Sequence, residues 1–230
     1  MNKKRIIILS ILITSSLQGQ DWANLERYKA DNKNLGSPTQ HEKRVVFMGN
    51  SITESWPNLL PEFFQNNSYI NRGISGQTTP QMLIRFRSDV IELKPRVVVI
   101  LAGINDIAEN TGPSSVEMIA GNIISMTELA SINNIKVIIS SILPAKNFSW
   151  RPSINPAPIV LAVNKLIKSY AKKNNISYVD YYSLMVDNQK GLIKEYGVDS
   201  VHPNKVGYEV MAGLVEKVII EVLKSEHKKN

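Results

Sequence analysis

The sequence of 230 residues contains no cysteine, and this absence excludes several kinds of protein chemistry at once. Without cysteine there are no disulfide bonds, no thiolate nucleophile and no cysteine-rich metal site. There is also no cysteine to carry a lipid, so the chain is not expected to be a lipoprotein. Histidine is scarce as well, because the chain has only three. Any role that needs an imidazole must fall to one of them.

Apolar runs long enough to cross a membrane are also missing. The apolar run at residues 6–13 is too short to span a bilayer as an anchor. It follows the basic residues at 3–5 and precedes a polar stretch, which is the pattern of a secretory signal. We therefore expect residues 1–19 to be a signal peptide, a secreted or periplasmic location, and no stable membrane insertion after cleavage.

The formal charge of +7 gives little support for nucleic-acid binding. Residues 1–19 hold three basic and no acidic side chains, so removing them leaves a charge of +4. Several of the remaining charges lie near the C-terminus, at Lys224, Lys228 and Lys229. This distribution predicts a solvated tail, and we expect no nucleic-acid partner.

Apolar strands alternate with amphipathic helices along the rest of the chain. Strands are expected at residues 44–50, from residue 69, and at 96–102, 136–142 and 177–180. Such alternation predicts an α/β fold with a parallel sheet and helices on both faces. No G-x-G-x-x-G phosphate-binding loop and no internal repeat is present.

Helices are expected before, between and after these strands. Their places are residues 21–33, 56–64, 79–93, a helix capped by Ser114, 159–173 and the C-terminal region. Residues 20–43 are expected to form an N-terminal helix and a polar linker, and residues 44–230 to form the main domain. The loop at 144–158 holds four prolines. Loops of this length in compact domains are often functional.

The stretch Val45–Thr53 carries the clearest sign of chemistry. An apolar run, typical of a strand buried in a parallel sheet, stops at Gly49, and Ser51 follows two residues later. Ligands of open α/β sheets bind at the carboxyl ends of the strands, so Ser51 is placed to meet one. The alternative is that Ser51 only caps the following helix.

A serine nucleophile needs a base within hydrogen-bond reach. His41 lies in the polar linker and His227 in the charged tail, which leaves His202 as the expected base. Asp199 precedes it by three residues, so its carboxylate can reach the imidazole, fix the tautomer and stabilise the imidazolium. The alternative is a turn aspartate beside a surface histidine, since this spacing alone is common.

Hydrogen-bond donors for an oxyanion are available in three places. The expected donors are the backbone N–H groups of Ser51 and Gly76 and the side-chain amide of Asn105. Gly76 lets the backbone approach a substrate closely because it has no Cβ. For Asn105 the alternative is an ordinary Asx turn after a strand.

Four of these stretches, in this order, resemble the signature blocks of the SGNH hydrolases, also called GDSL hydrolases, and the resemblance covers about residues 44–213. The matching residues are Ser51 for the nucleophile, Gly76 in Asn71–Gly76 and Asn105 in Gly103–Asp106 for the oxyanion hole, and Asp199 and His202 in Asp199–His202. The first block usually reads Gly-Asp-Ser-Leu, whereas this chain has Gly49-Asn50-Ser51-Ile52. Asn50 keeps the shape of aspartate without its charge.

The resemblance implies a flavodoxin-like three-layer α/β/α sandwich with about five parallel strands, and ester hydrolysis without a cofactor or metal. The platelet-activating-factor acetylhydrolase-like and carbohydrate-esterase branches are the most similar. We therefore expect a serine esterase that removes short acyl groups, mainly acetyl, from a glycan or small-molecule ester. The expected substrate contacts are Asn50, Trp150 and Arg151, and aromatic Phe148 lies in the same loop.

Two alternatives stay open at this point. One is a lysophospholipase or another lipid acyl esterase, although no apolar loop suggests a long acyl groove. The other is a non-catalytic glycan-binding protein on the same fold, since fold does not fix function. A competent side chain at every catalytic position disfavours this second alternative. The oligomeric state is left open.

Overall fold

Residues 21–225, the part of the chain described by a computed structural model, form a five-stranded parallel sheet flanked by helices. The strands stand in the order β2-β1-β3-β4-β5. Their bounds are β1 Val45–Gly49, β2 Tyr69–Gly73, β3 Val97–Leu101, β4 Lys136–Ser140 and β5 Ser177–Val179. The parallel sheet expected from the sequence is confirmed. The expected signal peptide at residues 1–19 and His227 lie outside the described residues.

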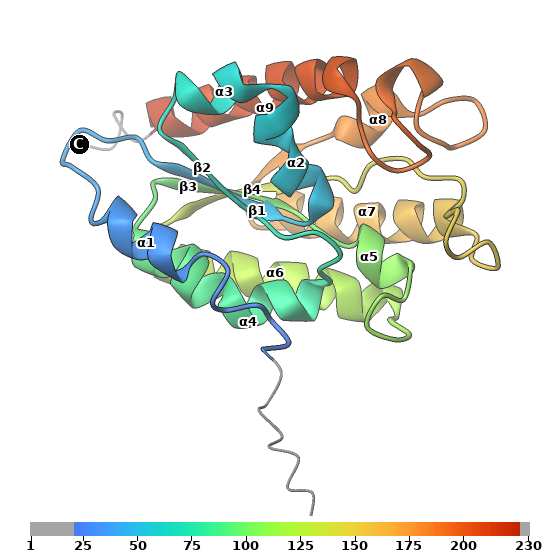
Figure 1. Ribbon diagram of the computed structural model, residues 1–230, viewed down its shortest axis with the longest axis horizontal. Coiled ribbons are helices and arrows are strands. Elements are labelled where there is room, and N and C mark those ends of the chain that lie inside the picture. Colours follow the sequence, from blue (N-terminus) through green and yellow to red (C-terminus); the bar gives the residue numbers. More distant parts are fainter. Residues whose placement is uncertain (1–20, 226–230) are drawn as a thin grey trace, which may run out of the picture.

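Helices cover both faces of the sheet and give the molecule three layers (Figure 1). Helices α4, α6 and α7 lie on one face, and α2, α3 and α9 lie on the other. The helices are α1 Lys29–Leu35, α2 Ser51–Leu59, α3 Pro61–Gln65, α4 Thr79–Asp89, α5 Ile104–Ile107, α6 Val116–Ile132, α7 Pro156–Lys173, α8 Tyr181–Met185 and α9 Lys205–Ser225, with 3₁₀ turns η1 Ile91–Leu93 and η2 Lys194–Tyr196. Within residues 21–225, no helix has the length and apolar character needed to cross a membrane.

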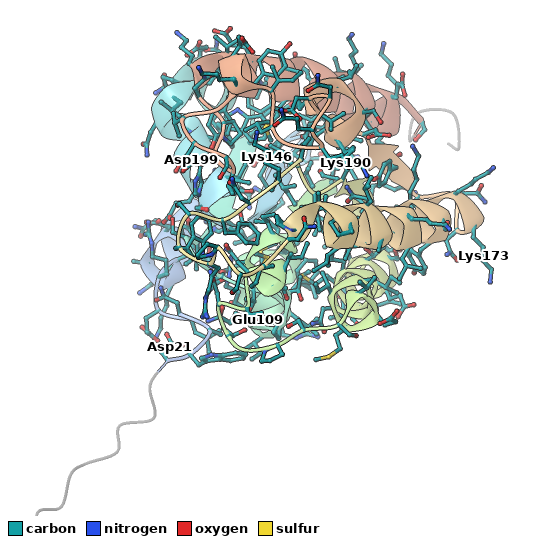
Figure 2. All side chains as sticks on the ribbon, turned by 90° about the vertical axis from the view of Figure 1, so that its right-hand side faces the viewer. Asp21, Glu109, Lys146, Lys173, Lys190 and Asp199 are labelled. Atoms are coloured by element: carbon teal, nitrogen blue, oxygen red, sulfur yellow. The ribbon has the colours of Figure 1, made fainter. Side chains whose placement is uncertain are left out.

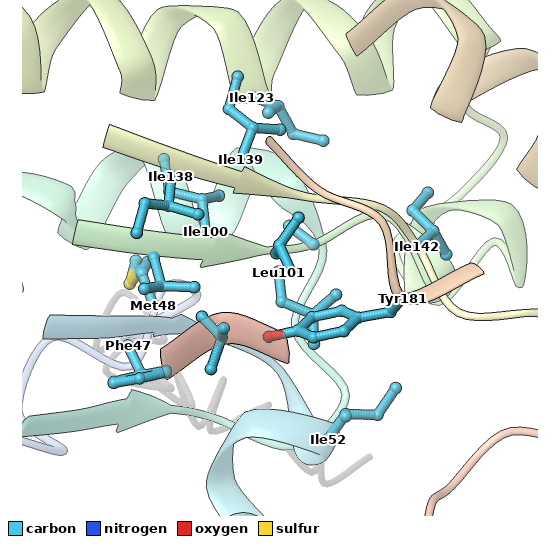
Figure 3. Packing of buried hydrophobic residues seen from close by; sticks show 14 of the residues in the cluster. Phe47, Met48, Ile52, Ile100, Leu101, Ile123, Ile138, Ile139, Ile142 and Tyr181 are labelled. Carbon is cyan, nitrogen blue, oxygen red and sulfur yellow. The ribbon is translucent and has the colours of Figure 1, made fainter. Parts of the chain in front are cut away.

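The two central strands explain why the core forms where it does. Every residue of β1 and β3 is buried, because helices cover both faces of the sheet. Figure 3 shows side chains of these strands packed with those of β4 and with the ring of Tyr181. A continuous apolar run is therefore the correct signature for a strand in this position.

The register of the sheet brings three loops to one edge. Gly49 at the end of β1 pairs with Gly73 at the end of β2 and with Leu101 at the end of β3. Parallel strands have their carboxyl ends on the same side, so the segments that follow them start side by side. These segments carry Ser51, Gly76 and Asn105.

The N-terminal segment, residues 21–35, differs from the expected helix. Residues 21–28 form turns, and α1 occupies only Lys29–Leu35. Trp22 and Leu25 are 49% and 43% exposed, whereas Tyr28 is buried. A short polar sequence gains too little from propensity alone to form a longer helix, and here tertiary hydrogen bonds decide its shape.

Three other helices start a few residues away from the positions expected from the sequence. Helix α2 starts at Ser51 rather than at Trp56 and accommodates Pro57 inside it. The cap of α6 is Ser115, whose hydroxyl accepts the Met118 N–H, and not Ser114. Helix α7 starts at Pro156, within the expected loop, because proline is favoured in the first helical turn.

Candidate active site

Ser51 lies just after the end of β1, as expected, but the alternative interpretation of this serine as a helix cap is wrong. It is the first residue of α2, directly after β1 and the connecting Asn50. The cap is Asn50, not Ser51, because Asn50 Oδ1 accepts the Ile52 N–H at 3.0 Å. This bond satisfies an otherwise free amide of the first turn. Asn50 is buried, and a contact between its side chain and substrate stays a prediction.

The structure brings Ser51, His202 and Asp199 together. Ser51 Oγ lies 3.0 Å from His202 Nε2, and His202 Nδ1 lies 2.9 Å from Asp199 Oδ2. A carboxylate only accepts hydrogen bonds, so Nδ1 carries the proton and Nε2 is free to accept from the serine hydroxyl. This arrangement can activate a serine nucleophile.

The loop that carries Asp199 favours its ionised form. Partial burial alone raises the pKa of Asp199, but the backbone N–H and ring of His202 and the backbone N–H of Val201 outweigh it and lower this pKa below its ordinary value. Both backbone N–H groups donate to Oδ1 at 2.7 Å. The carboxylate is therefore charged and fixed in orientation at neutral pH.

A buried aromatic contact joins the element after His202 to the element that starts with Ser51. Helix α9 begins at Lys205, and its Tyr208 hydroxyl donates to the Ile52 carbonyl in α2 at 2.7 Å. The Tyr208 ring also packs on Trp56, with ring centroids 5.3 Å apart. Residues 151 positions apart in sequence are held at hydrogen-bond distance by this packing.

The three expected oxyanion donors lie on segments that follow neighbouring strands at the same edge: Ser51 starts α2, Gly76 lies in the loop after β2, and Asn105 lies in α5. Gly76 has φ of +76°, a conformation that glycine adopts without strain. Within residues 21–225, neither the Ser51 N–H nor the Gly76 N–H has a hydrogen-bond acceptor. The Asn105 amide donates one hydrogen to the Gln77 carbonyl at 2.9 Å, which leaves its second hydrogen available.

The loop before Gly76 is tied to α2. Glu54, in the first turn of that helix, accepts the Ser75 N–H at 2.8 Å and also the Ser75 hydroxyl. On the other side, Asn110 Nδ2 donates to the Gly76 carbonyl at 3.2 Å. The position of the glycine relative to Ser51 therefore depends on several side chains and not on the loop alone.

The 144–158 loop borders the site, but two of its expected contacts point to solvent. Figure 2 views the molecule toward the carboxyl ends of the strands and labels Asp199 and Lys146 on this side. Ser200 Oγ donates to the Asn147 carbonyl at 3.1 Å, which joins the two loops. Trp150 packs on buried Phe148 and is itself exposed, as is Arg151. Their contact with substrate stays a prediction.

Sequence reasoning missed a group of buried polar residues beside the loop between β2 and α4, residues 74–78, which carries Gly76 and is called the oxyanion loop below. Arg85 Nε donates to Gln77 Oε1 at 2.6 Å, and its Nη1 pairs with Asp89 Oδ2 at 3.0 Å. All three side chains are buried. A signal was present, because Arg85 and Asp89 stand four residues apart and flank apolar Phe86 on the buried face of the helix.

Asp106 is buried and holds the start of α4. Its carboxylate accepts the Thr79 N–H at 3.0 Å and the Thr79 hydroxyl at 2.6 Å. Burial raises the pKa of Asp106 to about 6, although the bonds from Thr79 oppose that rise. Within the described residues, no three histidine, aspartate or glutamate side chains come together as a metal site requires.

Comparison with known proteins agrees with this geometry. The model of the GDSL-like lipase/acylhydrolase family matches residues 47–210, which include the serine, the histidine and the aspartate described above. The chain therefore belongs to this family. The family and the ester-hydrolase class expected from the sequence are confirmed.

Two solved structures share the fold over nearly their whole length. A candidate acylhydrolase of Bacteroides fragilis is 53% identical with a TM-score of 0.87, covering 89% of this chain and 99% of that chain. A GDSL-like lipase of Bacteroides thetaiotaomicron is 51% identical with a TM-score of 0.85, covering 86% and 98%. The three-layer α/β/α fold is confirmed.

Curated relatives match over a shorter stretch. An arylesterase of Vibrio mimicus is 28% identical over 131 residues, which is 52% of this chain and 64% of that protein. The chain spans 56% of the length of another curated relative. Because these matches cover only part of each relative, they do not establish the substrates or partners of the whole protein.

Proposed function

We propose that this protein is a serine esterase that removes acetyl or other short acyl groups from carbohydrate. The observation that carries the proposal is the hydrogen-bonded series Ser51–His202–Asp199, with distances of 3.0 and 2.9 Å. Each contact has the geometry of a base next to a nucleophile and of a carboxylate that orients the base.

The chemistry follows from these positions. His202 Nε2 takes the proton of Ser51 as Oγ attacks the ester carbonyl, and Asp199 stabilises the imidazolium that forms. The imidazolium then gives this proton to the departing alcohol, which leaves an acyl group on Ser51. Water, deprotonated by the same imidazole, attacks that acyl group. The bond to Ser51 Oγ then breaks, the imidazolium returns the proton to this oxygen, and the acid leaves.

The charge that develops on the carbonyl oxygen needs donors that are already in place. The N–H groups of Ser51 and Gly76 and the second amide hydrogen of Asn105 are proposed to supply them. Fixed donors act more strongly than water because they need no reorganisation during the reaction. No cofactor or metal is expected to take part.

A polar cavity beside Gly76 supports a carbohydrate substrate. Its volume is about 280 Å³, and its lining includes Trp22, Asp21, Asn24 and Asn110. An indole can cover the apolar face of a sugar ring, while amide and carboxylate groups bind hydroxyls. An acetyl xylan esterase, 19% identical with a TM-score of 0.64, has the same fold.

Export across a membrane is part of the same proposal. The basic and apolar residues at 3–13 have the pattern of a secretory signal, although they lie outside the described residues. One relative, 26% identical over 143 residues, is a Bacillus subtilis protein named as a lipoprotein. Such a location favours extracellular or periplasmic esters, and sequencing the N-terminus of the exported protein tests it.

Release of acetate from a panel of esters tests the substrate class. The panel contains acetylated xylan, acetylated oligosaccharides and acetylated small alcohols, with lysophosphatidylcholine as the lipid arm. We expect acetate from the glycans, loss of all activity in Ser51→Ala, and no labelling of that variant by an organophosphonate. Faster release of fatty acid than of acetate would instead support a lipid esterase, and no turnover of any ester would support a binding protein.

A further inference from the structure

Gln77 connects three segments of the chain beside the oxyanion hole. Its carbonyl accepts the Asn105 amide at 2.9 Å. Its side chain accepts from Arg85 Nε at 2.6 Å and donates from Nε2 to the Ala23 carbonyl at 2.8 Å. Gln77 is 3% exposed, so these bonds form in an environment that excludes water.

Arg85 extends this connection to the strand before the nucleophile. Its Nη2 donates to the Gly49 carbonyl at 3.0 Å. The same carbonyl accepts the Ile74 N–H at 3.1 Å, and the Ile74 carbonyl accepts the Gln77 N–H at 3.3 Å. The end of β1, the oxyanion loop and α4 are therefore joined through one buried guanidinium, which presents its donors in a fixed planar arrangement.

We propose that Gln77 is a positioning residue for the oxyanion hole, and that it acts through Asn105. A carboxamide offers a donor and an acceptor together, so Gln77 can bind Arg85 and the Ala23 carbonyl at the same time. These two bonds fix the Gln77 backbone, and its carbonyl in turn fixes the rotation of the Asn105 amide. The remaining amide hydrogen is then aimed before substrate arrives.

The N-terminal segment, residues 21–35, becomes part of the support of the site in this proposal. The sequence analysis placed this segment outside the main domain, yet it makes several hydrogen bonds to it. The Trp22 carbonyl accepts a hydrogen bond from the Gln81 side chain at 2.7 Å. Tyr28 donates its hydroxyl to the Gly73 carbonyl, and Asn32 donates to Asp89 Oδ1 at 2.8 Å. The contact through Ala23 is the one that reaches Gln77 directly.

The test is a comparison of Gln77→Ala with Asn32→Ala, using p-nitrophenyl acetate. Asn32→Ala also removes a carboxamide that joins the N-terminal segment to α4, but the hydrogen bonds of Asn32 go to Ser88, Asp89 and Arg72 and not to Gln77 or Asn105. We expect Gln77→Ala to lower kcat roughly 10- to 100-fold, since small misplacements of catalytic groups have effects of this size. KM should stay within about twofold, and Asn32→Ala should retain the wild-type kcat.

A double-variant cycle then separates positioning from general destabilisation. Asn105→Ala alone should lower kcat roughly 10²–10³-fold. Adding Gln77→Ala to it should lower kcat by no more than about twofold further, because the amide that Gln77 positions is already absent. The proposal would be overturned if Gln77→Ala lowered kcat by the same factor with and without Asn105→Ala. It would also be overturned if Asn32→Ala lowered kcat as much as Gln77→Ala does.

A second variant is available if Gln77→Ala does not fold. Gln77→Glu then replaces it in the same cycle, since glutamate keeps the acceptor for Arg85 but loses the donor to Ala23.

The inference rests on the proposed esterase function, and the wild-type protein tests that function separately. A wild type without esterase activity refutes the function, whereas an active wild type with an additive cycle refutes only the role of Gln77.

Discussion

At the scale of single residues, Asp199 has two tasks that can be separated. Oδ1 accepts two backbone N–H groups at 2.7 Å and shapes the loop, whereas Oδ2 accepts the imidazole N–H at 2.9 Å. Asparagine can keep the first task but not the second, because an amide nitrogen cannot accept the proton on Nδ1. The loop and the orientation of the histidine therefore need not fail together.

This separation gives a prediction for Asp199→Asn. We expect kcat to fall roughly 10⁴-fold while the thermal midpoint stays near that of the wild type, and we expect His202→Ala to fall further, roughly 10⁶-fold. Steady-state kinetics on p-nitrophenyl acetate, with thermal unfolding alongside, measure both.

The control for Asp199→Asn is Asp187→Asn. Asp187 Oδ1 accepts the Gln189 and Gly191 N–H groups at 2.8 Å in a similar turn, but neither described histidine, His41 or His202, is bonded to it. This variant should keep the wild-type kcat. If His41→Ala proved more damaging than His202→Ala, the assignment of the base would be wrong.

At the scale of elements, Asp106 links the segment after β3 to the start of α4 through Thr79. Its pKa is raised from 3.8 to about 6 by burial, so the folded state holds the proton more tightly than the unfolded state does. The contribution to stability is then fully present below about pH 4 and is lost as the pH rises through about 6. A shift of this size corresponds to about 3 kcal/mol.

Asp106→Asn should remove this dependence. Relative to the wild type, the free energy of unfolding of the variant should rise by up to about 3 kcal/mol between pH 4 and pH 7, because asparagine is neutral throughout. Urea unfolding of both proteins at a series of pH values measures the difference. A difference that does not change with pH would contradict the prediction.

Asp180→Asn is the matched control, because the pKa of Asp180 is shifted in the opposite direction. Burial raises it, but Lys168 and Ser183 outweigh that effect and lower the pKa below its ordinary value. Asp180 caps α8 by accepting the Ser183 N–H at 3.1 Å. The wild type gains stability from Asp180 as the pH rises. Relative to the wild type, the free energy of unfolding of Asp180→Asn should therefore fall as the pH rises.

The contact between β2 and α2 gives a prediction about packing. A Cβ at Gly73 would lie 2.1 Å from the Glu54 nitrogen and 2.6 Å from its Cα, and both atoms are backbone. Gly73→Ala must therefore move the helix that begins with Ser51. We expect a loss of about 3 kcal/mol or more in stability, together with a lower kcat.

Gly121→Ala provides the comparison. Gly121 lies inside α6, and a Cβ there would meet no atom within 4 Å. Alanine is the better helix former, so this variant should be more stable by about 0.5–1 kcal/mol with unchanged activity. Chemical denaturation measures both variants, and a Gly73→Ala protein as stable as the wild type would show that the helix moves at little cost.

At the scale of the whole molecule, the sequence was most informative where the pattern is periodic and continuous. The runs in β1 and β3 predicted buried parallel strands, and the parallel sheet then places Ser51, Gly76 and Asn105 at one edge. The scarcity of histidine pointed to His202, which the structure places 3.0 Å from Ser51.

What could not be predicted depends on contacts between distant segments. The N-terminal segment takes its shape from bonds to Gly73, Gln77 and Gln81, and no local pattern records these partners. The same is true of the buried ion pair of Arg85 and Asp89, because polar residues on a helix are usually exposed. Short elements such as α5 and α8 also lack enough residues to show a period.

The acyl preference is a property of the assembled site, and it yields the last prediction. The polar side chains nearest to Ser51 in sequence, Asn50 and Thr53, are buried, as are Gln77 and Asn105 in the segments that follow β2 and β3. We infer from these polar neighbours that the site offers little apolar surface to a long acyl chain. Each buried methylene would add roughly 0.8 kcal/mol, or about fourfold in binding, so a lipid esterase should show such a channel.

We therefore expect kcat/KM to be highest for p-nitrophenyl acetate and to fall steeply by the octanoate. The series is measured below the critical micelle concentration of each ester, with Ser51→Ala subtracted at every chain length as the background. The six methylenes that separate acetyl from octanoyl would raise kcat/KM by several orders of magnitude if they were buried in apolar surroundings. A steady rise along the series would mean that side chains from distant loops line an acyl groove, and the substrate would then be a lipid rather than an acetylated glycan.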